Sequence, residues 1–422
     1  MSIFVSIAAY RDPELIPTLL DCVRRARYPA DLRFGICWQH AEDEPAPPDP
    51  GVPLRLIDVP WRESRGACWA RAEIMKLYDG EDYFLQLDSH HRFVQDWDAR
   101  LIDQAERSGA ARPLLSTYPA SYDPNTPLAP GDEPTCMPFR SWTRDGIPLF
   151  GWQTMQDWRD RSSPMRARFL AAGMMFTLGR FVSDVPYDPD LYFYGEEATL
   201  AVRAFTHGYS LFHPSVHAIW HQNSPHMRAR HWDDHVPGQG VTVPEGVAAT
   251  GAQRDAASIQ KVRRFLLAPE IGPMGCGSAR AAAEYETYSG LIFHRRHASA
   301  EARRGDEPPP ALAPFLGPAD QRTWKLRIVL DRAVLPPGAL EHSRFWYVAF
   351  HDVNDIEIAR LDANRPELHT LTLGGGQIVI EREFDSLRPP ARWTVWPTDR
   401  RGQWMERISG PVGDGTVQLV AA

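Results

Sequence analysis

The stretch Asp82-Tyr-Phe-Leu-Gln-Leu-Asp-Ser-His-His-Arg-Phe93 decides how this sequence folds. Its first half, Tyr83 to Leu87, is aromatic and aliphatic with a single glutamine, and polar residues precede it. A short apolar run of this kind is typical of a strand that is buried on both faces of a parallel sheet. We therefore predict a buried strand that ends at Asp88, with a serine and two histidines directly after it.

A carboxylate and an imidazole lie two residues apart at the end of this strand. If the backbone stays extended, Asp88 and His90 project on the same side. Open α/β sheets bind ligands at the carboxyl ends of their strands, and one hard oxygen with one borderline nitrogen suits Mn²⁺ or a similar divalent ion. The alternative is that Asp88 caps the following turn and both histidines lie on the surface, because short motifs often match by chance.

The composition limits the class of protein. The chain has 422 residues, 43% of them hydrophobic, which predicts roughly two or three domains. A net charge of −8 gives no sign of nucleic-acid binding. No run approaches the ~18 apolar residues of a membrane span, and the N-terminus lacks the basic region of a signal peptide. The five cysteines are scattered without Cys-x-x-Cys spacing, which indicates free thiols of a cytoplasmic protein.

Strands and helices alternate through the N-terminal part of the chain. The hydrophobic pattern predicts helices at 13–27 and 64–78, and a parallel, doubly wound α/β sheet follows from the alternation. Asp12 is expected to cap the first helix. The strands that precede the buried strand are predicted at 3–8, 32–39 and 54–59. The loop after the first strand then lies at the same carboxyl edge as Asp88.

Arginines accompany this edge. Arg11 lies on the first loop, and Arg65 and Arg71 lie on the helix before the Asp88 strand. Guanidinium groups bind diphosphate oxygens through paired hydrogen bonds. Arginine is also the usual cation of this chain, so for any single Arg a plain surface role remains open.

These segments carry a resemblance to the cytosolic polypeptide N-acetylglucosaminyltransferases, whose characterised members modify hydroxyproline on a ubiquitin-ligase subunit. The residues that carry it are Ile3-Phe-Val-Ser-Ile-Ala-Ala-Tyr-Arg-Asp-Pro-Glu-Leu15, Arg65-Gly66, Ala70-Arg71, Gly80-Glu-Asp-Tyr-Phe-Leu-Gln-Leu-Asp-Ser-His90 and Trp97-Asp98. The pattern is similar, more distantly, to the polypeptide N-acetylgalactosaminyltransferases, which carry an Asp-x-His metal motif at this place. The resemblance covers residues 1–295.

The resemblance implies a glycosyltransferase-A fold, a UDP-GlcNAc donor and a divalent ion, Mn²⁺ or Mg²⁺. The ion would bridge Asp88 and His90 to the diphosphate. The residues expected to border the donor are Ala8, Ala9, Tyr10, Arg11, Arg65, Arg71, Asp88 and Ser89. Residues 119–168 show little periodicity and are expected to form a lid, in which Trp152 is a candidate sugar platform. The other interpretation is that its aromatic side chains only pack the loop down.

Two further segments contribute candidates. Phe169 to Leu178 is predicted as a strand whose small residues Ala171-Ala172-Gly173 admit a ligand or a packed helix. Glu196 and Glu197 open a helix, where the macrodipole alone explains carboxylates. By resemblance we assign both to the sugar site as catalytic candidates, with Glu196 preferred. The weaker candidates there are Asp188 and Asp190.

Histidines are dense between residues 213 and 235. The resembled families supply a third metal ligand from this region, and we assign His221, with His217 as the second choice. Together with Asp88 and His90 it would form a facial set with open positions for phosphate oxygens and water. The following residues, 223–257, are expected to form a mobile polar loop, from which Arg228 and Arg230 reach the diphosphate.

The pattern changes in the C-terminal part. We expect a nucleotide-sugar-binding domain over 1–296, a Pro-rich linker over 297–320 and a small antiparallel β-sandwich over 321–422. Strands are predicted there at 324–330, 345–350, 357–361, 368–373, 377–384, 392–396 and 404–408. This domain is expected to bind acceptor or carbohydrate, or only to cap the first domain.

The sequence therefore predicts a metal-dependent glycosyltransferase that moves N-acetylglucosamine, or a related hexosamine, from a UDP-sugar to a hydroxyl of a protein or glycan. Retention of configuration is what the resemblance implies. Two other classes remain open: a nucleotide-sugar- or glycan-binding protein without turnover, and a metal-dependent hydrolase that uses the histidines. We expect no nucleic-acid partner and no membrane span.

Overall fold

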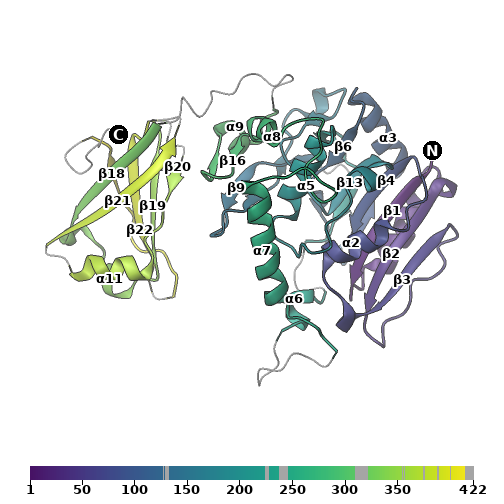
Figure 1. Ribbon diagram of the computed structural model, residues 1–422, viewed down its shortest axis with the longest axis horizontal. Helices are drawn as coiled ribbons and strands as arrows, with labels where there is room; N and C mark the ends of the chain where they lie inside the picture. The colour runs from purple at the N-terminus through teal and green to yellow at the C-terminus, as the bar shows by residue number, and fades with distance from the viewer. Residues whose placement is uncertain are drawn as a thin grey trace. The chain divides into compact units, whose positions relative to one another are not determined.

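The computed structural model describes residues 1–126, 128, 133–223, 228–236, 246–308, 322–353, 355, 357–373, 376–386, 389–399 and 401–413. The chain divides into two compact units, Met1–Ala313 and Pro314–Ala422. Each unit has its own hydrophobic core. Figure 1 labels the helices and strands of both units.

A mixed eight-stranded sheet forms the centre of the first unit, with the order β12-β14-β6-β13-β4-β1-β2-β3. Its strands are β1 Ile3–Tyr10, β2 Leu32–His40, β3 Leu54–Pro60, β4 Tyr83–Asp88, β6 Pro113–Ser116, β12 Met165–Arg166, β13 Met174–Leu178 and β14 Ser210–His213. β1, β2, β3 and β4 pair in parallel, as predicted. β13 runs antiparallel between β4 and β6, and β12 runs antiparallel to β14, so the sheet is mostly parallel, as expected, rather than entirely so.

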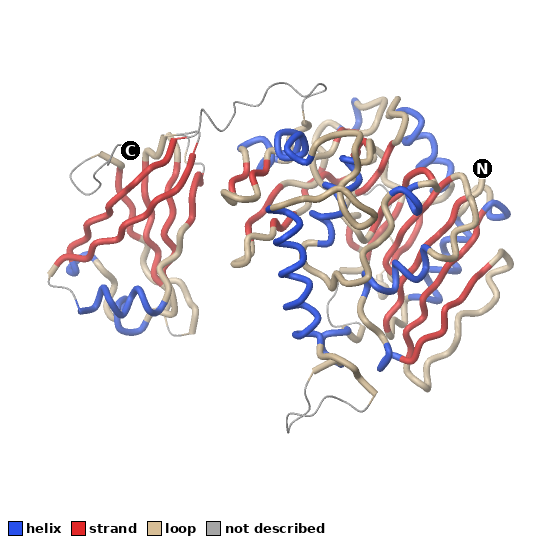
Figure 2. The backbone as a smooth tube through the Cα atoms, in the orientation of Figure 1, coloured by secondary structure: helices blue, strands red, loops and turns tan. Residues whose placement is uncertain are grey.

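Helices cover both faces of this sheet, as Figure 2 shows. The described helices of this unit are α1 Leu15–Arg25, α2 Ala67–Met75, α3 Trp97–Arg107, α4 Phe181–Asp184, α5 Glu196–Thr206, α6 His231–Asp234, α7 Gly251–Leu267, α8 Ala282–Ser289 and α9 Ala300–Arg304. Successive residues of β1 enter opposite cores: Phe4 joins the cluster with Ile74 of α2, whereas Val5 joins the cluster with Leu19 of α1. Among the described helices, none combines the length and apolar character that crossing a membrane requires.

Short strands occupy the region that was predicted as a lid. The strands are β7 Ala120–Ser121, β8 Thr135–Cys136, β9 Phe139–Trp142, β10 Pro148–Phe150 and β11 Gln153–Thr154. β7 joins β5 (His91–Phe93) and β15 (Ile219–His221) in a separate three-stranded sheet. The strand predicted at 169–178 begins only at Met174.

Two segments that were expected to be irregular contain helices or strands; their residues 224–227, 237–245 and 309–320 lie outside the described part of the chain. The predicted loop at 223–257 contains α6 and the start of α7, which the Thr250–Gln253 capping box begins. The predicted linker at 297–320 is wrong over its first part: β16 (Leu291–Ile292) pairs with β17 (His297–Ala298), and α9 follows. This part is anchored by Arg168, which donates to the carbonyls of Asp306 and Glu307.

The second unit contains two antiparallel sheets that share one core cluster. β18 (Arg322–Asp331) pairs with β21 (Gln377–Ser386), and the other sheet has the order β20-β19-β22-β23. Its strands are β20 Glu357–Arg360, β19 Trp346–His351, β22 Arg392–Pro397 and β23 Ile408–Pro411, and the helices are α10 Ala339–His342 and α11 Arg365–Leu373. The strand predicted at 368–373 is therefore wrong, because Leu368 buries its side chain in the core from a helix.

Gly35 of β2 is a site where close packing sets the stability of the first unit. A Cβ there would lie 2.7 Å from Phe4 Cζ and 2.8 Å from Ile74 Cγ2. Overpacking a core of this kind costs about 1–3 kcal/mol. We expect Gly35→Ala to lower the free energy of unfolding by that amount in urea denaturation followed by tryptophan fluorescence. Gly272→Ala is the matched control, because its Cβ meets no atom within 4 Å; equal stability of the two variants would contradict this packing.

Candidate active site

Asp88 stands at the carboxyl end of β4, between β1 and β13. Its backbone N–H donates to the carbonyl of Gly173 at 3.1 Å. A Cβ on Gly173 would lie 2.7 Å from Asp88 Oδ2, so glycine leaves the room that this carboxylate occupies. The small residues before β13 therefore admit the Asp88 side chain itself.

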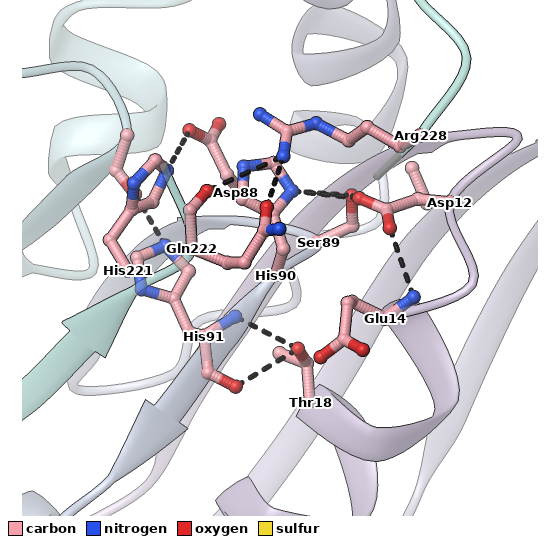
Figure 3. A network of polar contacts seen from close by, with 12 residues as sticks. Asp12, Glu14, Thr18, Asp88, Ser89, His90, His91, His221, Gln222 and Arg228 are labelled. Atoms are coloured by element: carbon pink, nitrogen blue, oxygen red, sulfur yellow. Dashed lines mark hydrogen bonds and ion pairs between the residues drawn. The ribbon is translucent and has the colours of Figure 1, made fainter. Parts of the chain in front are cut away.

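Two histidines converge on Asp88 (Figure 3). One ligand atom each from Asp88, His91 and His221 lies within 4.8 Å of the others, which makes them a possible metal-binding group among the described residues. The backbone explains the convergence, because β15 pairs with β5 and sets His221 opposite His91. The structure thus brings together Asp88 and His221, as the sequence analysis proposed, and adds His91.

His90 lies beside this group with a different set of contacts. Its Nδ1 donates to Asp12 Oδ2 at 2.7 Å, and its buried Nε2 has no hydrogen-bond partner within the part of the chain that the structure describes. Metal-ligating histidines commonly donate their other ring nitrogen to a carboxylate in this way. Both nitrogens of His91, in contrast, face backbone carbonyls, those of Trp220 at 2.9 Å and Gly173 at 3.2 Å. Distance favours His91 as the third ligand, and the free nitrogen favours His90.

Sequence reasoning missed Asp12 and His91. Asp12 Oδ2 accepts hydrogen bonds from Ser89 Oγ at 2.6 Å and from His90, so it orients the segment after β4. Its other oxygen accepts from the N–H of Glu14, but α1 begins at Leu15 with Glu14 as its N-cap and no side-chain capping bond, so the predicted cap at Asp12 is wrong. The extended alternation assumed for Asp88 and His90 ends where β4 ends, and β5 begins a new strand at His91.

The carboxyl group of Asp88 is ionised. Burial acts to raise its pKa, but the contact with His221 and the positive charge of Arg71 hold the pKa of Asp88 well below its usual range. Arg71 donates to Asp88 Oδ1 at 2.6 Å, and His221 Nε2 lies 3.3 Å from Oδ2. Each oxygen of the carboxylate therefore faces a different partner.

Arg71 also connects Asp88 to Glu196. The guanidinium is 4% exposed and donates to Glu196 Oε1, which accepts a second hydrogen bond from Tyr187 OH at 2.5 Å. Gln86 of β4 donates in turn to the Tyr187 oxygen at 2.9 Å. The residues predicted to bind diphosphate and sugar, Arg71 and Glu196, thus form a buried ion pair directly behind Asp88.

Glu197 has a different environment from its neighbour. Its carboxylate accepts hydrogen bonds from Tyr118 OH and from the N–H of Ala172, the latter at 3.0 Å. Burial raises the pKa of Glu197 to about 7, and these two hydrogen bonds oppose the rise without cancelling it. Glu197 is therefore a carboxyl group in this site that exchanges its proton near neutral pH.

The loop after β1 is held by α6. Tyr10 OH and the Arg11 guanidinium both donate to Asp234 Oδ2 at 2.9 Å. Ala8 pairs with Asp88 across the parallel β1–β4 ladder, and the carbonyl of Ala9 accepts from a glutamine side chain of β2. Ala8 therefore lies beside Asp88 in the sheet, and the next three residues of the chain follow it at the end of β1 and directly after it. All four were predicted to border a nucleotide.

Apart from Arg228, the remaining candidates make their contacts outside this group. Trp152 is 60% exposed in the connection between β10 and β11, and Arg65 is exposed with its guanidinium over Trp69. Arg228 donates to Gln222 Oε1 at 2.6 Å, beside His90 in Figure 3. His217 stacks edge-on against a tryptophan and lines a small separate cavity. The other weaker candidates, Asp188 and Asp190, both accept from Lys261, whereas Arg230 lies over Trp232.

Comparison with solved structures gives weak similarities. TarS 1-349 from S. aureus is 10% identical over 70% of this chain and 71% of that chain, with a TM-score of 0.39. Its complex with UDP-GlcNAc is 9% identical over 70% and 72%, with a TM-score of 0.40. GalNAc-T7 with UDP, GalNAc and Mn²⁺ is 15% identical over 72% and 54%, with a TM-score of 0.43. We base no conclusion on similarities of this size.

Comparison of sequences is more informative. Curated proteins give no match to this chain. The family model described as Glycosyltransferase (GlcNAc) matches residues 2–51 and 50–303, which is most of the chain and nearly the whole first unit. The matched range contains Asp88, both neighbouring histidines and His221. This chain therefore belongs to the Glycosyltransferase (GlcNAc) family.

Proposed function

We propose that this chain is a metal-dependent enzyme that transfers N-acetylglucosamine, or a related hexosamine, from a UDP-sugar to a hydroxyl group of a protein or glycan. The observation that carries the proposal is the convergence of Asp88 with buried imidazoles at the carboxyl edge of the sheet, inside the range of the glycosyltransferase family model. The family description supports N-acetylglucosamine as the sugar, and hence UDP-GlcNAc as the donor.

The side chains around Asp88 are of the kinds that bind a divalent ion. His221 Nδ1 lies 2.6 Å from Asn223 Oδ1, an acceptor that would keep the ring proton on Nδ1, so Nε2, which now contacts Asp88, would be available to an ion held between them. His90 supplies a buried nitrogen, Nε2, that has no hydrogen-bond partner among the described residues. One carboxylate with imidazoles and no thiolate suits Mn²⁺, and also Mg²⁺ with fewer protein ligands. A bound ion would neutralise charge on the leaving diphosphate.

We assign Asp88, His90 and His221 as the residues that hold this ion. His90 is preferred over His91 because Asp12 fixes its ring and leaves Nε2 free. Arg71 and Glu196 are positioning residues in this proposal, since both are buried in the ion pair that orients Asp88. A site held by such a network needs little rearrangement when the substrate binds.

The loop after β1 would border the uridine. Tyr10 and Arg11 are hydrogen-bond donors whose present acceptor is the carboxylate of Asp234. An anionic diphosphate offers the same kind of acceptor, so donor binding would compete with Asp234 for Arg11. Arg65, Ser89 and Trp152 remain proposed donor contacts, and Trp152 would act by stacking.

We propose transfer with retention of configuration. In a front-face attack the proton of the acceptor hydroxyl passes to the leaving phosphate oxygen, so no separate protein base is required. Glu197 is then the carboxyl group that we place next to the sugar, because its proton is retained near neutral pH. A cytoplasmic location is also part of the proposal, supported by five buried cysteines that are all free thiols.

Calorimetric titration with UDP, UDP-GlcNAc, UDP-GalNAc and UDP-glucose, with and without Mn²⁺, tests the donor site. We expect Mn²⁺-dependent binding that favours UDP-GlcNAc, because the ion joins the diphosphate to Asp88. Asp88→Asn should remove the Mn²⁺ dependence while the circular dichroism spectrum stays unchanged. Failure of every nucleotide to bind would contradict the proposal, and equal affinity with a chelator would show that the diphosphate is held without metal.

The choice between the two adjacent histidines is open to a direct test. We expect His90→Ala to weaken Mn²⁺ binding by more than roughly 10–100-fold, because it removes a ligand and the loss of an outer-shell partner alone costs about that much. His91→Ala should mainly lower the melting temperature, since this side chain is fully buried. His217→Ala is the control and should change neither the Mn²⁺ affinity nor the melting temperature. A larger loss of Mn²⁺ affinity in His91→Ala would replace His90 by His91 in the ligand set.

Glu197 makes stability depend on pH. The unfolded chain releases this proton near pH 4.5, whereas the folded protein keeps it up to about pH 7. Stability is therefore lost as the pH rises through this window, by about 3 kcal/mol at ~1.4 kcal/mol per pKa unit. Relative to Glu197→Gln, the wild-type free energy of unfolding should fall between pH 5 and pH 8. Glu270→Gln changes an exposed glutamate, so its free energy of unfolding should depend on pH as that of the wild type does. If the free energy of Glu197→Gln also followed the wild-type pH dependence, the shifted pKa would be contradicted.

A further inference from the structure

The second unit carries an exposed tryptophan, Trp404, in a β-bridge with Thr398. Trp404 is 47% exposed, and among the described residues of this unit the other large exposed apolar side chains are two valines. The turn before it is closed by Asp399, whose N–H donates to the Gln403 carbonyl at 2.8 Å. The Asp399 carboxylate accepts from the N–H groups of Arg401 and Gln403, each at 2.8 Å.

Other aromatic rings hold the indole of Trp404 in place. It stacks on Trp396, with the ring centroids 4.5 Å apart and the planes 30° from parallel. Phe345 and Tyr347 meet it edge-on, with centroids at 5.7 Å and 6.4 Å. Trp396 is itself fixed, because its Nε1 donates to the Met405 carbonyl at 2.8 Å. A ring ordered in the free protein loses little further freedom when a ligand stacks on it.

Polar side chains surround this aromatic surface. Gln403, Glu406 and Arg407 are exposed neighbours of Trp404 along the chain. The Arg407 guanidinium lies over the Trp396 ring, 6.0 Å from its centroid. An exposed aromatic surface is thus bordered by hydrogen-bond donors and acceptors of both charges.

We propose that the Trp404 surface, formed by Phe345, Tyr347, Trp396 and Trp404, binds a glycan. A hexopyranose with equatorial substituents presents an apolar C–H face of the size of an indole, while its hydroxyls require polar partners around the rim. A protein partner fits less well, since a stable protein interface buries about 800 Å² on each side. One exposed indole with a charged rim offers far less apolar area.

Glycan binding at the Trp404 surface would help a glycosyltransferase to hold its acceptor. The family model ends at residue 303, so the family match gives this unit no role. A second unit that holds a glycan would raise the effective concentration of a glycan-bearing acceptor near the enzyme unit. Equatorial sugars such as N-acetylglucosamine and glucose, in β-linked polymers, are the class that we assign. The inference goes beyond the proposed donor chemistry, and its test uses no transfer reaction.

Affinity electrophoresis and calorimetry of the full chain test the proposal. The probes are β-1,4-linked N-acetylglucosamine oligomers, a soluble β-glucan and, as an axial-hydroxyl comparison, a mannan. We expect binding of at least one β-linked equatorial polymer, weakened at least tenfold or about 1.4 kcal/mol in Trp404→Ala. Val353→Ala is the matched control, because it removes an 83% exposed apolar side chain from the same unit and should bind as wild type does.

Further variants separate ligand contact from folding. Because Trp404 packs on Trp396, Trp404→Ala could loosen the unit, so its melting temperature is measured alongside. Trp404→Phe keeps an aromatic ring in the stack but shortens the platform, and we expect intermediate affinity. Gln403→Ala removes a rim side chain outside the core and should weaken binding severalfold. The proposal is overturned if the wild type and both Trp404 variants bind the glycans equally, or if the wild type binds none of the probes. UDP-sugar binding should be unchanged in all variants.

Discussion

The ionised carboxylate of Asp88 is the constraint on which the first unit depends. Its side chain is only half-buried, but the Arg71 guanidinium against it is fully buried, and a buried charge must be paired and hydrogen-bonded because its desolvation is otherwise too costly. Arg71 supplies the pairing charge, and the buried guanidinium then requires Glu196 as a second partner. Each of these ion pairs joins two elements, so side-chain contacts link β4 to α2 and α2 to α5. Gly173 is part of the same constraint, since any larger residue would occupy the space of the carboxylate.

This network separates two glutamates that look equivalent in the sequence. Glu196 neutralises Arg71 and accepts a hydrogen bond from Tyr187, so its charge is fully used inside the protein. Glu197, one residue later on α5, accepts instead from Tyr118 and a backbone N–H. The helix start explains why both are carboxylates. Burial raises the pKa of Glu197 to about 7 despite these two hydrogen bonds.

Elsewhere in both units, local patterns predicted some elements and missed others. Alternating apolar residues predicted most strands of the second unit, because one face of each strand packs on the core. The segment at 368–373 has too few residues to distinguish the two periods, and it forms the end of α11. The interval at 297–308 lacked apolar periodicity, yet it is ordered by contacts with Arg168, more than 100 residues earlier. Contacts this distant leave no local sequence signal.

The sequence by itself determined the central strands, the end of β4 at Asp88 and the candidates Asp88 and His221, because apolar runs, turn residues and a short motif are local signals. Only the tertiary structure decided that Asp12 orients His90, that His91 reaches the same group, and that Arg71 faces Glu196. These pairs join segments far apart in the chain, and which atoms meet depends on strand register and side-chain packing. A local pattern names the residues that can carry a charge or a lone pair, whereas the fold decides which partner each one has.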